Sequence, residues 1–219
     1  MKLSSAIIFS ALLLTGLYAQ EYQPGDHELL IMPTAYTMEK GQSYFSDYEL
    51  VFLNYSYAVS SGTHLAVFTL FPVTADFLET LTFGAKQKYI NGEDVKAAVW
   101  VTFTPKVSGL TIGSVFSFGK PSNGFHLGIG TASSFEEKTE EWPLVIMAGY
   151  RVDISGTLSL LAEYTNAKAA IDEGFNGLLS IGLRFRGETM SWELGGIRPL
   201  ETTGDLLFLP LLKATLLID

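Results

Sequence analysis

Short segments of alternating apolar and polar residues follow one another from residue 27 to the end of the chain, separated by Gly, Asn, Ser and Asp. This period of two is typical of β-strands with one apolar face, and no segment has a helical period. The pattern predicts about twelve strands, within a range of about ten to fourteen. The expected strands are 27–38, 42–59, 63–72, 79–90, 95–105, 109–119, 124–134, 142–153, 157–165, 176–186, 189–199 and 206–217.

The two faces of these strands differ in kind. In segment 179–186, large apolar side chains alternate with Ser180, Gly182, Arg184 and Arg186. A strand with lipid on one side and a polar interior on the other has this pattern. The barrel must close, because an open sheet edge leaves unpaired amides in hydrocarbon. The sequence therefore predicts an all-β fold, a single antiparallel up-and-down transmembrane β-barrel.

A soluble β-barrel or sandwich is the alternative, since it has the same alternation. Two features favour the membrane. The small face is dominated by Gly, Ser, Thr and Ala, and charged residues make up only 17% of the chain, against about 25% in ordinary globular proteins. Aromatic residues near strand ends also suggest the girdles of outer-membrane barrels: Tyr44, Tyr48, Tyr57, Tyr89, Tyr150, Tyr164 and Phe185.

Residues 1–19 have the organisation of a signal peptide. Lys2 is followed by an apolar stretch over residues 6–17, and Ala19 provides a small residue for cleavage. The stretch is shorter than the roughly 20 apolar residues that a transmembrane helix needs. We therefore expect export through the Sec pathway, one domain over residues 20–219, and location in the outer membrane. The chain has no cysteine, which excludes disulfides, thiolate metal sites and a lipoprotein anchor.

An even number of strands places both termini on the periplasmic side, with longer loops outside at 73–78, 135–141, 166–175 and 200–205. Those loops carry Glu136, Glu137, Glu140, Glu141, Asp172, Glu173 and Asp205. Other charged residues fall on or near the inner face, and we treat them as a candidate lumen-facing cluster: Lys86, Lys88, Arg151, Arg184, Arg186, Glu49, Glu163 and Glu193. Opposed charges there would line or fill the lumen. Alternatively, the basic residues snorkel toward the periplasmic interface.

Catalytic chemistry is poorly represented. No nucleophile elbow, phosphate loop, dinucleotide fingerprint or zinc motif occurs, so we expect no enzyme, no cofactor and no metal site. The three histidines, His27, His64 and His126, lack metal-ligand spacing. His126 is expected on the inner face, where a packed or solvated role is the default. The net charge of −9 argues against nucleic acid as a partner.

Over most of its length, the chain resembles a group of small, functionally uncharacterised outer-membrane β-barrel proteins of Gram-negative bacteria. The resemblance lies in Pro33-Thr34-Ala35, the turn at Lys40-Gly41, the aromatic segment ending in Tyr57-Ala58-Val59, and the late Leu209-Pro210-Leu211. It implies an outer-membrane barrel, with the lipid bilayer and the outer-membrane assembly machinery as partners, and no known active site. The chain departs from the usual terminal aromatic residue, since it ends in Leu217-Ile218-Asp219.

Three functions follow from these expectations. The first is a narrow passive or porin-like channel for small solutes, since about twelve strands leave a narrow lumen. The second is a closed structural or interaction barrel without transport. The third is a lipid-modifying enzyme, which the lack of a catalytic motif disfavours.

Overall fold

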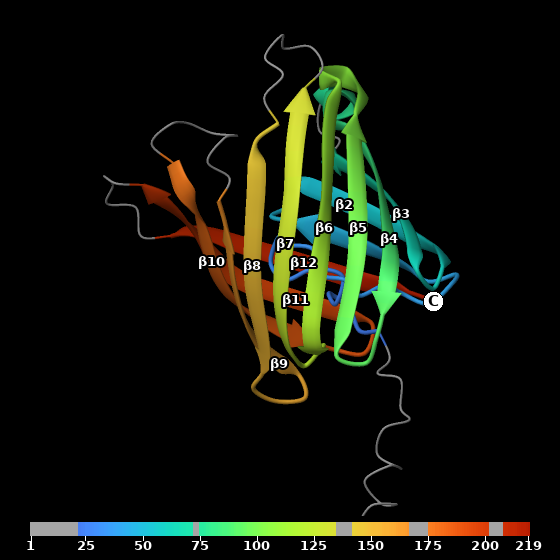
Figure 1. Ribbon diagram of the computed structural model, residues 1–219, viewed down its shortest axis with the longest axis vertical. Coiled ribbons are helices and arrows are strands. Elements are labelled where there is room, and N and C mark those ends of the chain that lie inside the picture. Colours follow the sequence, from blue (N-terminus) through green and yellow to red (C-terminus); the bar gives the residue numbers. More distant parts are fainter. Residues whose placement is uncertain (1–21, 72–74, 135–141, 167–174, 202–207) are drawn as a thin grey trace, which may run out of the picture.

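Twelve β-strands form one closed antiparallel barrel in the computed structural model, which describes residues 22–71, 75–134, 142–166, 175–201 and 208–219 (Figure 1). Each strand pairs with its neighbours along the chain, and β1 closes the barrel against β12. The predicted all-β, up-and-down barrel of twelve strands is confirmed. The strands are β1 Ser43–Tyr48, β2 Phe52–Ser60, β3 Thr63–Leu70, β4 Thr82–Asn91, β5 Val95–Thr104, β6 Gly109–Lys120, β7 Asn123–Ser134, β8 Leu144–Asp153, β9 Leu158–Thr165, β10 Phe175–Arg186, β11 Met190–Glu201 and β12 Leu209–Ile218.

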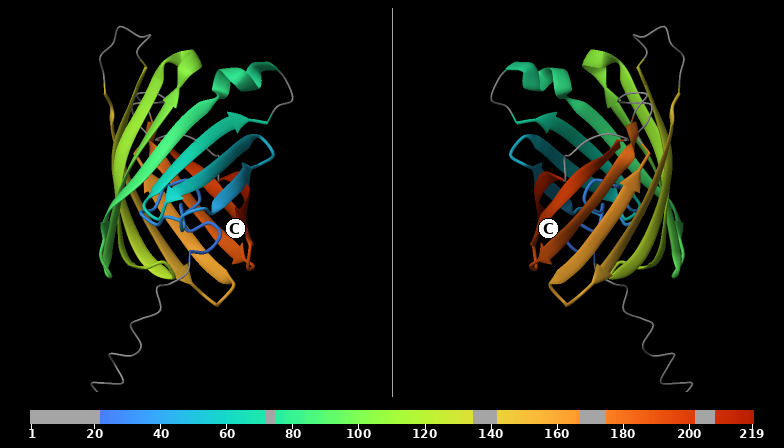
Figure 2. Two further views of the ribbon diagram at one scale, coloured as in Figure 1. Left: turned by 90° about the vertical axis from the view of Figure 1, so that its right-hand side faces the viewer. Right: turned by 90° about the vertical axis from the view of Figure 1, so that its left-hand side faces the viewer.

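Short 3-10 helices, η2 (Ala75–Thr80) and η3 (Pro105–Val107), lie at the end of the barrel that carries the longer loops. Within the described ranges, no helix is long and apolar enough to cross a membrane. The wall is uneven: β1 has six residues, whereas β6 and β7 have twelve each (Figure 2). The signal segment and the acidic loop residues 136, 137, 140, 141, 172, 173 and 205 lie outside the described residues.

The expected strand at residues 27–38 is wrong. This segment forms only one isolated bridge, between Glu28 and Pro33, and runs inside the barrel, where Figure 2 draws it in blue. Pro33 has no N–H to offer to a strand ladder. Gly25 has a φ of +86°, which turns the chain before the segment enters the lumen.

The expected strand at residues 42–59 is also wrong, because it is two strands. β1 and β2 meet at a tight turn in which Glu49 and Leu50 have φ values of 58° and 59°. Non-glycine residues seldom adopt this left-handed conformation, so the composition of the turn did not reveal it. The count of twelve survives because one expected strand is lost and one is split.

Side chains alternate between the two faces as the sequence predicted. Phe125, Leu127 and Ile129 of β7 are exposed on the outer face, while His126 between them is buried in the interior. Many large apolar side chains of the described strands are exposed on this outer surface, among them Leu65, Ile129 and Leu194. The expectation that Tyr44 and Tyr48 belong to an aromatic girdle on the outer face is wrong. Both lie on the inner face, beside the N-terminal segment.

Candidate functional site

Residues 22–42 fill the middle of the barrel, and we call this segment the plug. Its side chains Leu29, Leu30 and Ala35 are fully buried. They pack with Met32 against inner-wall residues of five strands, namely Ala98, Val115, Leu161, Leu211 and Met147. The lumen at this level is therefore an apolar core built between the plug and the wall, rather than an open passage.

Glycines of the inner wall make room for the plug. A Cβ atom added at Gly149 of β8 would overlap the Leu29 Cδ1 atom, and one at Gly182 of β10 would lie 2.9 Å from Leu30 Cδ2. Real Cβ atoms do not approach other heavy atoms so closely. The Gly-rich inner face that suggested a crowded interior thus faces the chain's own N-terminal segment.

A carboxylate of the wall holds the tip of the plug. Glu163 of β9 accepts hydrogen bonds from the backbone N–H groups of Leu30, Ile31 and Met32 at 3.0 to 3.1 Å. Ile31 is the exposed apolar residue of this tip. Successive N–H groups that converge on one anion form a backbone nest, which satisfies buried donors that a strand would otherwise pair.

Two cations of the wall bind the plug's carbonyl groups. Arg184 Nη2 donates to the carbonyl oxygens of Glu28 and Leu29, at 2.8 and 2.9 Å. Lys213 Nζ donates to the carbonyl oxygens of Leu29 and Leu30, at 2.8 and 3.1 Å. Together with Glu163, these side chains recognise the plug mainly through its backbone.

The same cations belong to a buried chain of charges. Arg184 pairs with Glu193 at 2.6 Å, and both side chains are fully buried. Glu193 also pairs with Lys213, which reaches Glu28 of the plug at 3.1 Å. Buried charges need partners of this kind, because an unpaired one is very costly.

A second charged cluster lies nearer the short turns. Arg151 contacts Asp26 of the plug at 2.5 Å and Asp153 at 3.0 Å. Arg186 contacts Asp153 at 2.6 Å and also bonds Gln23 of the plug. Each cluster thus joins a plug carboxylate, Asp26 or Glu28, to basic residues of the wall.

His27 and Glu28 titrate away from their ordinary ranges. Burial lowers the pKa of His27, although Glu28, 3.0 Å from its Nε2, opposes this shift. Burial alone would raise the pKa of Glu28, but Lys213 and His27 outweigh it and hold that pKa below its ordinary value. Glu28 is therefore the charged partner in the docked plug, while His27 is the neutral one.

The structure brings together five residues of the expected lumen-facing cluster and separates the others. Arg151, Arg184, Arg186, Glu163 and Glu193 are buried on the inner wall around the plug. Lys86 faces the plug at the His27 carbonyl, whereas Lys88 lies nearer the turn and is half-buried. Glu49 is exposed in the β1–β2 turn and does not join the cluster.

Sequence reasoning missed Lys213, Asp26, Glu28 and Asp153 as members of these clusters. A signal for Lys213 was available, because it is the single charged residue of the mainly apolar β12. Asp26 and Glu28 carried no such signal, because their segment was assigned to the wall and not to the lumen.

The histidines of the inner wall have structural partners. His126 Nδ1 lies 2.8 Å from Ser117 Oγ, and that hydroxyl accepts the N–H of Ala35. His64 Nε2 accepts the N–H of Met38 at 2.8 Å. In the described ranges, no three His or acidic side chains cluster as a metal site would require.

Comparison with known proteins gives no family. No protein-family model matches the chain, and no curated protein matches it. Among solved structures, a variant of the Rh. blastica porin is 12% identical with a TM-score of 0.42, covering 76% of this chain and 55% of the porin. The Acinetobacter baumannii outer membrane protein Omp33 is 11% identical with a TM-score of 0.43, covering 80% of this chain and 95% of that one.

Proposed function

We propose that the protein is an outer-membrane β-barrel that its own plug holds closed. Membrane insertion is supported by the apolar residues exposed on the outer face of the strands, such as Leu65, Ile129 and Leu194. Export through the Sec pathway and insertion by the outer-membrane assembly machinery belong to this proposal.

The observation that carries the closed state is the use of the inner-wall charges. Glu163, Arg184 and Lys213 bind the plug's backbone, so they do not face a water-filled passage. A porin-like pore keeps its lumen polar and open. The closed structural or interaction barrel is therefore our first candidate, ahead of a permanently open channel.

A gated channel for small solutes is the second candidate, and one observation favours it. The wall behind the plug is charged, and buried ion pairs are weak evidence for a role in stability alone. Backbone hydrogen bonds join the end of the plug to β2, where Gly41 donates to Ala58 and Ala58 donates to Gln42. Within the described residues, the backbone of residues 24–40 has no such bond to a strand, so departure of this part would leave the strand pairing intact. The bared wall would carry more cations than carboxylates: Lys86, Arg151, Arg184, Arg186 and Lys213 against Asp153, Glu163 and Glu193.

Planar-bilayer recording tests both candidates, on the folded chain and on a variant without residues 24–40. We expect no conductance steps from the complete protein, and steady conductance from it would contradict a barrel closed by the plug. A gated channel requires conductance with anion preference from the deletion variant, reduced by Arg184→Ala and Arg186→Ala. A deletion variant that folds but shows no conductance would rule out the gated channel and leave the closed barrel as the remaining candidate.

Membrane location has a separate test. The folded protein should appear in the outer-membrane fraction as a heat-modifiable band, because a closed barrel resists detergent until it is heated. Recovery as a soluble periplasmic protein would overturn the proposed membrane location, but it would not contradict the proposal that the plug closes the barrel.

A further inference from the structure

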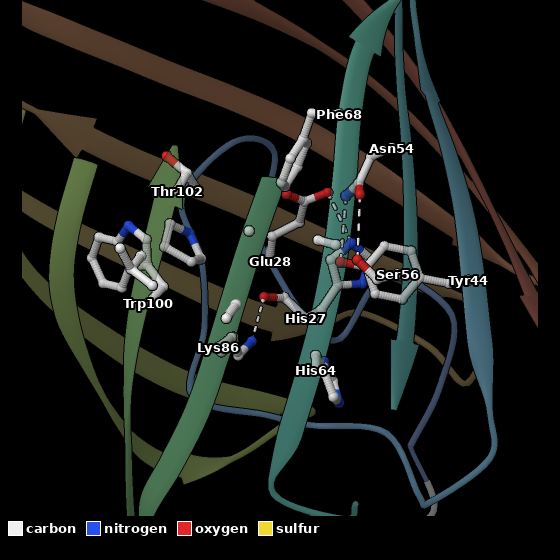
Figure 3. A pocket seen from close by; sticks show the side chains of 15 residues that line it. His27, Glu28, Tyr44, Asn54, Ser56, His64, Phe68, Lys86, Trp100 and Thr102 are labelled. Carbon is white, nitrogen blue, oxygen red and sulfur yellow. Dashed lines mark hydrogen bonds and ion pairs between the residues drawn. The ribbon is translucent and has the colours of Figure 1, made fainter. Parts of the chain in front are cut away.

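A cavity of about 100 Å³ lies between the plug and the wall formed by β1 to β5 (Figure 3). His27, Glu28 and Pro33 of the plug form one side. The lining on β3 and β5 runs toward Phe68 and Thr102, in the direction of the longer loops, where both side chains are only partly buried. A volume of this size holds several waters and therefore a small organic solute.

Lys86 of β4 is the basic residue of this cavity that has no ion-pair partner among the described residues. Its ammonium donates to the His27 carbonyl oxygen at 3.2 Å, and no carboxylate of the described residues comes within 4.0 Å of it. The other basic residues at the plug, Arg151, Arg184, Arg186 and Lys213, each have such a partner. An ammonium has three donors, so Lys86 can bind an anion without losing its bond to the plug.

Glu28 lines the same cavity but does not form an ion pair with Lys86. Its Oε1 atom is already bound by Lys213, His27 and the Tyr48 hydroxyl. Lys86 therefore keeps hydrogen-bond donors that an anion entering the cavity can use.

The rest of the lining fits a small organic molecule. Trp100 lies against Gly113, where a Cβ atom would collide with its indole ring, so the ring presents a flat apolar surface beside Lys86. Asn54 adds amide donors, one of which makes only a long contact of 3.4 Å to Tyr44. A mostly apolar pocket with a few convergent polar groups is the usual form of a small-molecule site.

We propose that this cavity binds a small organic anion, a carboxylate or a phosphate ester, with Lys86 as its counter-ion and Trp100 and Phe68 as its apolar wall. The plug supplies one side of the site, so a bound anion also favours the docked plug. The inference does not depend on whether the barrel conducts.

Isothermal titration of the folded barrel in detergent tests the site, with benzoate, inorganic phosphate and neutral benzyl alcohol as probes. We expect one anion to bind with a stoichiometry near one, and benzyl alcohol to bind at least about tenfold more weakly, because it lacks the charge-assisted hydrogen bond. Lys86→Met should weaken the anion by about tenfold or more, and Lys86→Arg should restore part of the binding. Benzoate binding without phosphate binding assigns a carboxylate, and the reverse assigns a phosphate.

Two controls keep the result specific. Lys88→Met removes a cation from the same face of the same strand but outside the cavity lining, so it should leave binding unchanged. Ala66→Leu fills the cavity without altering charge and should abolish binding in a barrel that still migrates as folded. Equal binding by the Lys86→Met protein, or no anion binding by the complete protein, overturns the proposal.

Discussion

The carboxylate of Glu163 on β9 accepts the backbone N–H of Met32 at 3.0 Å, across a sequence separation of 131 residues. The same carboxylate binds the N–H groups of Leu30 and Ile31, so one wall residue satisfies three successive donors of the plug. This contact orders a segment that has no secondary structure of its own, and it fixes how deeply the plug enters the barrel.

Glu163→Gln should loosen the plug while leaving the barrel intact. The amide offers one acceptor oxygen where the carboxylate offers two, so buried N–H groups lose their partner at a cost of about 1–3 kcal/mol. Hydrogen exchange of peptides spanning residues 29–33 should rise by about tenfold or more. Glu188→Gln, at an exposed turn, is the matched control. Unchanged exchange in the Glu163 variant would show that the nest does not hold the plug.

Gly149→Ala should act on the plug through sterics alone. The added methyl group would overlap Leu29 Cδ1 and crowd Met32 Sδ at 3.1 Å, while the nearest wall atom is 3.5 Å away. Overpacking of this kind costs about 1–3 kcal/mol of unfolding free energy. Gly156→Ala is the control, because nothing lies within 4 Å of its Cβ position.

A double-mutant cycle separates this effect from a general weakness of β8. Leu29→Ala alone leaves a cavity and costs about 2–5 kcal/mol. Combined with Gly149→Ala it should cost less than the sum of the two, because the new methyl group enters the vacated space. Urea unfolding in detergent measures the three free energies, and strict additivity would mean that the two residues do not touch.

The strands could be predicted from the sequence because the alternation of apolar with small or polar residues is local. Each strand, such as β7, carries both of its faces in its own residues. The plug could not be predicted from the sequence, because its short apolar run from Leu29 to Met32 also suits a strand. In the structure, Leu29, Leu30 and Met32 instead face a core inside the barrel. Nothing local to the segment distinguishes a core made with the inner wall from a face turned to lipid.

Only part of the candidate site could be predicted from the sequence, for the same reason. Arg184 and Glu193 stand out in the sequence as charges on a small-residue face, and pairing between neighbouring strands brings them together. Their link to Glu28 passes through Lys213 and crosses the lumen, so it exists only once the plug is inside. Contacts across a lumen leave no periodic signal in either partner.

The buried pair Arg184–Glu193 should be far more sensitive to charge removal than an exposed one. Glu193→Gln leaves Arg184 and Lys213 without a shared carboxylate, in a place where both side chains are 0% exposed, and should cost about 3–5 kcal/mol. Glu79→Gln breaks the pair with Lys106, whose side chains are 56% and 59% exposed, and should cost at most about 1 kcal/mol. Urea unfolding of both variants gives the comparison, and equal losses would contradict the burial argument.

Acid should release the plug, because both titrating residues at its base act in the same direction. Glu28 has a pKa below its ordinary value of 4.5 when docked, so its contribution is present above that value and is lost as the pH falls below it. His27 has a pKa below its ordinary value of 6.5, because burial, together with nearby Lys213 and Lys86, outweighs the opposing effect of Glu28. The released plug therefore binds the proton first. Docking should weaken as the pH falls below 6.5, and further below 4.5.

Protease cleavage within residues 22–42, followed from pH 8 to pH 4, measures this release, with an acid-tolerant protease and a denatured control for its own pH profile. His27→Gln removes the group that titrates first. The increase in cleavage near pH 6.5 should therefore be smaller in this variant, while the increase at lower pH should remain. Cleavage that stays constant over this range, or falls in acid, would mean that the charges around Glu28 and His27 do not hold the plug in place.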